Sequence, residues 1–175
     1  MTRTKKWVVC ALFAAIIAII APFAIPVGPV PVTFTLFALA LTAFVGGSSI
    51  GARAAVIYIL MGIIGMPVFS GFKGGLSAFM DPTGGFIYSY IFIVLILGLC
   101  TKTKSKTAMV LLWTSALLIC YAAGVSWYMF ITKANFLTAL TLCIVPFIPF
   151  DILKLVVAYI VAKAIRKALD KAGLM

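Results

Sequence analysis

The sequence contains no histidine, no glutamate and only three acidic residues, which are Asp81, Asp151 and Asp170. Its four cysteines are far apart and form no C-x-x-C pair. Zinc, haem and iron–sulfur centres require His or closely spaced Cys ligands, so none is expected here. The cysteines are interpreted as small apolar packing residues rather than as a disulfide framework.

Nucleotide-binding motifs are also missing. The chain has neither a G-x-x-x-x-G-K-[ST] loop nor a G-x-G-x-x-G turn. These motifs cradle phosphates, so this chain is not expected to bind or hydrolyse a nucleotide. No cofactor is expected, and any energy input must come from another chain.

Charge is scarce as well: 10% of the 175 residues are charged, against roughly 25% in soluble domains, and 65% are hydrophobic. This composition predicts an all-α integral membrane protein. At roughly 20 apolar residues per helical span, fewer for short helices, the length allows about six spans. We therefore expect a single transmembrane domain over residues 1–175, with no extramembrane domain.

The apolar segments predict six spans. The basic start at Met1–Lys6 is typical of a signal peptide, but a proline-rich segment and further spans follow it, so the first span is expected to be retained. The chain from 136 to 145 is too short to span and is expected to form an outer-face helix or half-helix. The predicted spans are residues 6–23, 34–45, 52–66, 86–99, 108–131 and 149–167.

Basic residues orient these spans. An even number of spans puts both termini on one side, and the positive-inside rule makes that side cytoplasmic. Lys73 and Lys133 fall outside, with Lys154 at the outer end of the sixth span. The net charge of +11 therefore needs no nucleic-acid partner. Eleven basic residues fall inside: Arg3, Lys5, Lys6, Arg53, Lys102, Lys104, Lys106, Lys163, Arg166, Lys167 and Lys171.

Asp151 and Lys154 are the most informative polar residues, because they open the last apolar span three positions apart and so share a helix face. Ionisable groups in a span usually face the protein interior or a wet cavity. They either serve a function or neutralise each other and hold the helix end.

Three other outer features are predicted to converge with this pair on one outward-facing pocket. They are the Pro/Gly linker at 25–33, the glycine-rich loop between Met66 and Gly85, and the aromatic end of the fifth span. Gly84 and Gly85 could aim free N–H groups at an acceptor. The loop could instead be a flexible connector, and aromatics such as Trp127 could form an interfacial belt.

The first span carries a stripe of small residues at spacings of three and four. Such stripes let two helices approach closely in lipid, either between subunits or within one chain, and spacing alone leaves both possibilities open. The stripe comprises Ala11, Ala14, Ala15, Ala18 and Ala21.

Five segments of the chain form a distinctive set of motifs: Pro29-Val30-Pro31-Val32-Thr33-Phe34-Thr35-Leu36, Gly62-Ile63-Ile64-Gly65-Met66-Pro67-Val68-Phe69, Gly74-Gly75-Leu76, Pro82-Thr83-Gly84-Gly85-Phe86 and Pro146-Phe147-Ile148-Pro149-Phe150-Asp151-Ile152-Leu153-Lys154. Through these motifs the chain resembles, over nearly its whole length, the BioY family, the biotin-specific S components of energy-coupling factor (ECF) transporters. The resemblance favours docking on a coupling subunit as the role of the alanine stripe.

The resemblance implies a six-helix protein in the bacterial cell membrane that captures biotin on its outer face. It also implies partnership with a transmembrane coupling subunit and two ATPase subunits, which use ATP. The docking residues would be Ala11, Ala14, Ala15 and Ala18. The ligand-binding residues would be Asp151, Lys154, Thr33, Thr35, Phe69, Gly84, Gly85, Tyr88 and Trp127.

Three alternatives remain at this stage. The same architecture could bind another vitamin such as thiamine or riboflavin. A membrane enzyme could use Asp151 as a base, although no nucleophile, base and orienting group can be recognised together. An assembly subunit without a ligand is the third.

Overall fold

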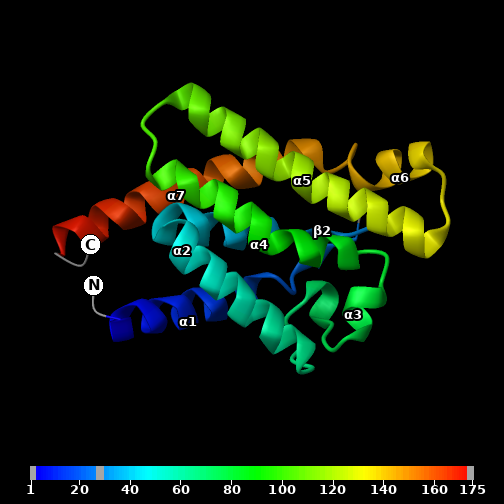
Figure 1. Cartoon of the computed structure of the whole chain (residues 1–175), viewed down its shortest axis with the longest axis horizontal. Helices are drawn as coiled ribbons and strands as arrows, with labels where there is room; N and C mark the ends of the chain where they lie inside the picture. The colour runs from blue at the N-terminus through cyan, green and yellow to red at the C-terminus, as the bar shows by residue number, and fades with distance from the viewer. Residues whose placement is uncertain (1–2, 27–29, 173–175) are drawn as a thin grey trace.

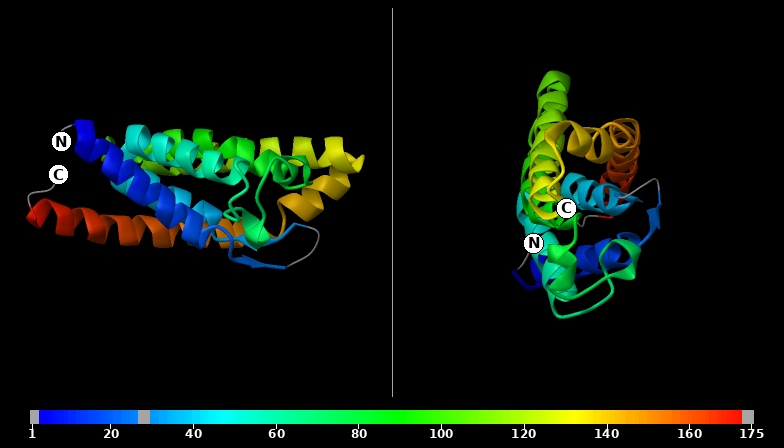
Figure 2. Two further views of the ribbon diagram at one scale, coloured as in Figure 1. Left: turned by 90° about the horizontal axis from the view of Figure 1, so that it is seen from below. Right: turned by 90° about the vertical axis from the view of Figure 1, so that its right-hand side faces the viewer.

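The computed structural model describes residues 3–26 and 30–172 and is predominantly helical (Figure 1). The helices run roughly side by side along the long axis (Figure 2). The start of the first helix and the end of the last helix lie at the same end of the molecule (Figure 1). The elements are α1 (Arg3–Ile20), β1 (Ala24–Ile25), β2 (Val32–Thr33), α2 (Thr35–Ile63), η1 (Ser70–Phe72), α3 (Ser77–Met80), α4 (Gly84–Gly98), η2 (Leu99–Thr101), α5 (Lys106–Thr132), α6 (Phe136–Cys143) and α7 (Ile148–Lys171).

Helix α2 is broken at Gly47, which has φ +72° and ψ 178°. A Cβ placed on Gly51 would lie 3.4 Å from the Cα of Ala43. In a continuous helix, eight residues would rise about 12 Å. The chain therefore folds back at Gly47 into two arms, a conformation that glycine adopts without steric cost.

The two arms correspond to the second and third predicted spans, but the break is sharper than expected. Residues 46–51 were expected to form a connection, whereas the second arm resumes immediately after Gly47. Ser48 donates its hydroxyl to the carbonyl of Leu95 at 2.7 Å. A Cβ on Gly98 would lie only 2.2 Å from the backbone nitrogen of Ser48. The short turn thus packs directly on the end of α4.

The core surrounds α2, which packs against α1, α4 and α7, while α5 packs on α4. Its largest fully buried side chains include Tyr58, Leu39 and Ile93. Many large apolar side chains elsewhere are exposed, among them Leu118 and Ile160. Such a surface suits a lipid environment rather than water.

By length and composition, three helical segments of the described chain could cross a membrane: Thr35–Ile63, Gly84–Thr101 and Lys106–Thr132. The pair α6 and α7, bent by 41°, could form a fourth as one broken span. Helix α1 is only 18 residues long and carries Arg3, Lys5 and Lys6 in its first turn. The basic start therefore lowers its apolar content.

The linker after α1 is largely extended. Ala24 pairs with Thr33 and Ile25 with Val32 in a short antiparallel ladder. The proline- and glycine-rich sequence of the linker disfavours a helix, in agreement with these paired residues; positions 27–29 lie outside the described residues. This ladder and α3 lie towards the end of the molecule opposite the start of α1 and the end of α7 (Figures 1 and 2).

Candidate ligand-binding site

A pocket lies where the linker, the glycine-rich loop and helices α2, α4, α5 and α7 meet. Its empty volume is about 760 Å³, part of it open to solvent. Pockets for small organic ligands typically combine apolar walls with few polar groups. The apolar part of the lining includes Val30, Leu36, Phe69, Phe86, Ile87, Ile93 and Phe147.

Asp151 and Lys154 form a buried ion pair at this pocket. The ammonium of Lys154 lies 2.8 Å from one carboxylate oxygen of Asp151, and the two side chains are only 11% and 8% exposed. The hydroxyl of Tyr121, from α5, donates to the other carboxylate oxygen at 2.9 Å. Both Asp151 oxygens are thus hydrogen-bonded, as a buried charge requires.

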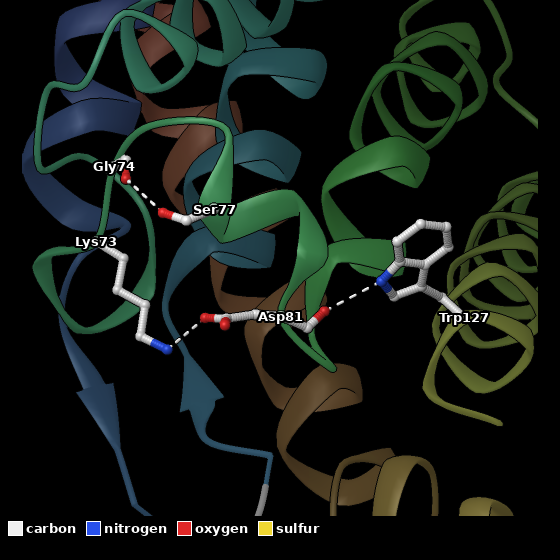
Figure 3. A network of polar contacts seen from close by, with 5 residues as sticks. All are labelled: Lys73, Gly74, Ser77, Asp81 and Trp127. Atoms are coloured by element: carbon white, nitrogen blue, oxygen red, sulfur yellow. Dashed lines mark hydrogen bonds and ion pairs between the residues drawn. The ribbon is translucent and has the colours of Figure 1, made fainter. Parts of the chain in front are cut away.

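A second ion pair joins Lys73 to Asp81, and both residues also line the pocket. Its side chains are far more exposed, at 59% and 34%. The indole N–H of Trp127 donates to the backbone carbonyl of Asp81 at 3.0 Å (Figure 3). The loop that carries Lys73 is therefore tied to α5 through Asp81.

The loop itself is packed rather than loose. Phe69 and Phe79 are buried and meet edge to face at 5.6 Å, and Phe69 also meets Tyr58 at 5.6 Å. Tyr58 donates its hydroxyl to the carbonyl of Val68 at 3.1 Å. By contrast, Phe72 is largely exposed. Two of the three phenylalanines of the loop are thus packed, which contradicts the alternative of a flexible connector.

Five of the nine predicted ligand-binding residues line the pocket: Asp151, Lys154, Thr33, Thr35 and Phe69. The hydroxyl of Thr35 also donates to the carbonyl of Ala21 at 3.4 Å, joining α2 to the end of α1. The linker, the loop and α7 thus meet in space as predicted, although they are far apart in sequence.

The other four predicted residues, Gly84, Gly85, Tyr88 and Trp127, are not among the residues that line the pocket. A Cβ on Gly84 would lie 2.1 Å from the carbonyl oxygen of Phe79, and one on Gly85 2.3 Å from the Cβ of Trp127. These glycines let α4 approach its neighbours. Tyr88 is 45% exposed and meets Trp127 edge to face, with ring centroids 5.2 Å apart.

Several pocket residues were not predicted. Lys73 and Asp81 could have been found from sequence, because they are the charges of a glycine-rich loop in a chain poor in charge. Ser70 carried no such signal. Its hydroxyl oxygen is buried and has no hydrogen-bond partner, and the residue lines the pocket.

The alanines of the stripe differ in burial. Ala14 is 1% exposed and packs in the core, as does Ala21. The prediction of an exposed docking surface is therefore wrong for Ala14, which faces the protein interior. Ala11 and Ala15 are exposed and Ala18 is half-buried, so these three form the available surface.

Substituting Gly85 by Ala tests the packing role. The added methyl group would overlap the Cβ of Trp127 and lie 2.5 Å from the carbonyl oxygen of Ala123, both on α5. Overpacking of this kind costs about 1–3 kcal/mol, so the purified protein should melt at a lower temperature in detergent. Ala122→Val, at an exposed position of α5, is the control. An unchanged melting temperature for Gly85→Ala would contradict the packing role.

The fold defines the class of the protein. A crystal structure described as the S-component for biotin from an ECF-type ABC transporter matches with a TM-score of 0.84 over 95% of each chain, at 24% identity. The chain therefore has the helical membrane fold of ECF S components. Residues 1–171 match the model of the BioY family, and the chain belongs to that family.

Similar sequences have closely matched lengths. "Biotin transporter BioY" of Thermotoga maritima is 36% identical over 93% of this chain and 96% of its own length. "Probable biotin transporter BioY" of Pyrococcus horikoshii is 33% identical over 94% and 98%. "Biotin transporter BioY2" of Lactococcus lactis is 34% identical over 97% and 94%.

Proposed function

We propose that this chain is the biotin-binding subunit of a vitamin uptake transporter. The observation that carries the proposal is a pocket with a buried Asp151–Lys154 pair, in which both Asp151 oxygens are hydrogen-bonded, in a member of the BioY family. The chain is a transport subunit and not an enzyme.

The pocket matches the chemistry of biotin. Biotin presents two ureido N–H donors, a carbonyl acceptor, an apolar ring with its sulfur, and a carboxylate tail. A carboxylate such as Asp151 can accept from ureido N–H groups, and Lys154 can donate to a carbonyl or carboxylate oxygen. The apolar walls suit the ring.

In the proposed membrane arrangement six spans cross the bilayer, with both termini in the cytoplasm and the pocket open outwards. Two features support it. The fold-back at Gly47 divides α2 into two arms. Together with α1, α4, α5 and α7, these arms make six segments. The pocket is lined in part by Thr33 of β2 and Ala78 of α3, and these elements lie towards the end of the molecule opposite the start of α1 and the end of α7 (Figure 1). The start of α1 and the end of α7 carry basic residues, which favour the cytoplasmic side.

We propose a bacterial cell membrane as the location, and as partners a coupling subunit and two ATPase subunits. In this proposal ATP is used by another chain, because this sequence has neither of the two nucleotide-binding motifs. The docking surface would be the exposed side of α1 around Ala11, Ala15 and Ala18, where small side chains allow close helix approach.

Binding of radiolabelled biotin to the detergent-purified chain tests the function. We expect saturable binding without ATP and without any other subunit, because the pocket lies wholly within this chain. Unlabelled biotin should compete, whereas thiamine and riboflavin should not. Binding of thiamine or riboflavin in place of biotin would refute the specificity and leave the fold untouched.

A further inference from the structure

Four charged side chains line the pocket, and their surroundings differ sharply. Asp151 and Lys154 are nearly inaccessible, whereas Lys73 is 59% exposed. A carboxylate loses much hydration when it is buried, and it loses less at a partly exposed position. The binding of an anionic group in this pocket therefore costs the least hydration free energy beside Lys73.

The loop around Lys73 also offers a neutral donor. The hydroxyl oxygen of Ser70 is buried at the pocket without a hydrogen-bond partner, and a buried polar atom left unpaired costs free energy. Ser70 lies three residues before Lys73, within η1. A carboxylate oxygen bound here would satisfy this hydroxyl while its charge is balanced by the ammonium.

Asp81 holds Lys73 in place before a ligand arrives. Its carboxylate pairs with Lys73, and its backbone carbonyl accepts from Trp127 (Figure 3). The backbone contact fixes Asp81 to α5 independently of its side chain. Exposed ion pairs contribute little, about 0–1 kcal/mol, so an incoming carboxylate can compete with Asp81 for Lys73.

We propose that Ser70 and Lys73 form the subsite for the carboxylate of the ligand, and that Asp81 is the counter-ion of Lys73 in the empty protein. This rests on the proposed biotin-binding function. It makes the glycine-rich loop a determinant of specificity for acids over neutral analogues. Lys154 is then left to meet the neutral end of the ligand.

The test compares biotin with biotinamide, in which a neutral amide replaces the carboxylate, by equilibrium competition on purified protein. Wild type should prefer biotin, and Lys73→Gln should weaken biotin binding about tenfold while leaving biotinamide nearly unchanged. Ser70→Ala should give a smaller loss in the same direction. Lys73→Arg, which keeps the charge, should retain the preference.

Two further variants guard against indirect effects. Lys133→Gln removes a lysine that lies outside the pocket lining, on the C-terminal side of α5, and should leave the preference intact. The double variant Lys73→Gln/Asp81→Asn removes both charges of the pair, so no charge is left unpaired. This double variant should lose the preference for biotin over biotinamide, as Lys73→Gln does. It therefore tests the subsite even if Lys73→Gln folds poorly.

The outcomes separate this proposal from the function on which it rests. If wild type binds neither compound, the biotin function fails. If wild type binds both equally, or if the double variant still prefers biotin as strongly as wild type does, the Ser70–Lys73 subsite is wrong while biotin binding stands.

Discussion

Asp151→Asn should weaken biotin binding by about one to two orders of magnitude, since one charge-assisted hydrogen bond contributes roughly 1.5–3 kcal/mol. The substitution keeps the shape but turns half of the group into a donor. The same carboxylate also accepts from Tyr121 and pairs with Lys154. Equilibrium binding of radiolabelled biotin to the purified variant measures the effect.

Lys154→Met should weaken binding at least as much, because Asp151 would be left as a buried charge without its cation. Breaking a buried pair from one side costs about 3–5 kcal/mol of stability, so both single variants should also melt at lower temperature. If Lys154 rather than Lys73 meets the carboxylate, Lys154→Met, and not Lys73→Gln, should blunt discrimination against biotinamide.

Two controls separate ligand binding from structural support. The double variant Asp151→Asn/Lys154→Met leaves no unpaired charge and should recover much of the lost stability without recovering binding. Tyr121→Phe removes one hydrogen bond to Asp151 without changing charge, and should have a smaller effect. Normal biotin binding by the folded double variant would show that the pair is structural.

Ala15→Trp should reduce biotin uptake by the complete transporter about tenfold or more while leaving binding to the isolated chain nearly intact. Ala15 is exposed on α1, between Ala11 and Ala18 along the proposed docking surface. A bulky ring there would hold two helices apart, and close packing is the main source of their association in lipid. Uptake into cells that express all subunits is the measurement.

Val110→Trp, at a 60% exposed position of α5, controls for bulk added elsewhere on the apolar surface and should leave uptake unchanged. Ala14→Trp should behave differently from Ala15→Trp, because Ala14 is buried and its replacement should lower stability and expression. Unchanged uptake with normally expressed Ala15→Trp would show that this side of α1 does not dock.

Ala14 is buried and Ala15 is exposed, and the sequence alone does not predict this difference. A spacing of three and four places Ala11, Ala14, Ala15 and Ala18 on one broad face. It does not say which edge of that face meets α2. Similarly, Gly84 and Gly85 suggested exposed N–H donors, whereas their missing side chains are needed for packing against Phe79 and Trp127. Glycine is equally suited to both uses.

The sequence by itself determined the helical membrane class and the need of Asp151 and Lys154 for partners. Scarce charge in a long apolar chain excludes a soluble fold, and an ionisable pair inside an apolar segment needs partners wherever the helix lies. The fold-back at Gly47 followed in outline from the same local chemistry, because a glycine pair interrupts an apolar run.

Only the tertiary structure decided which residues share the pocket. Tyr121 lies 30 residues from Asp151, and Lys73 and Ser70 belong to a loop that reaches the pocket only when α2, α4 and α7 pack together. Such contacts depend on the relative positions of whole helices, which the pattern of any single segment does not specify. The fold therefore brings a buried charge pair and a partly exposed one to the same cavity.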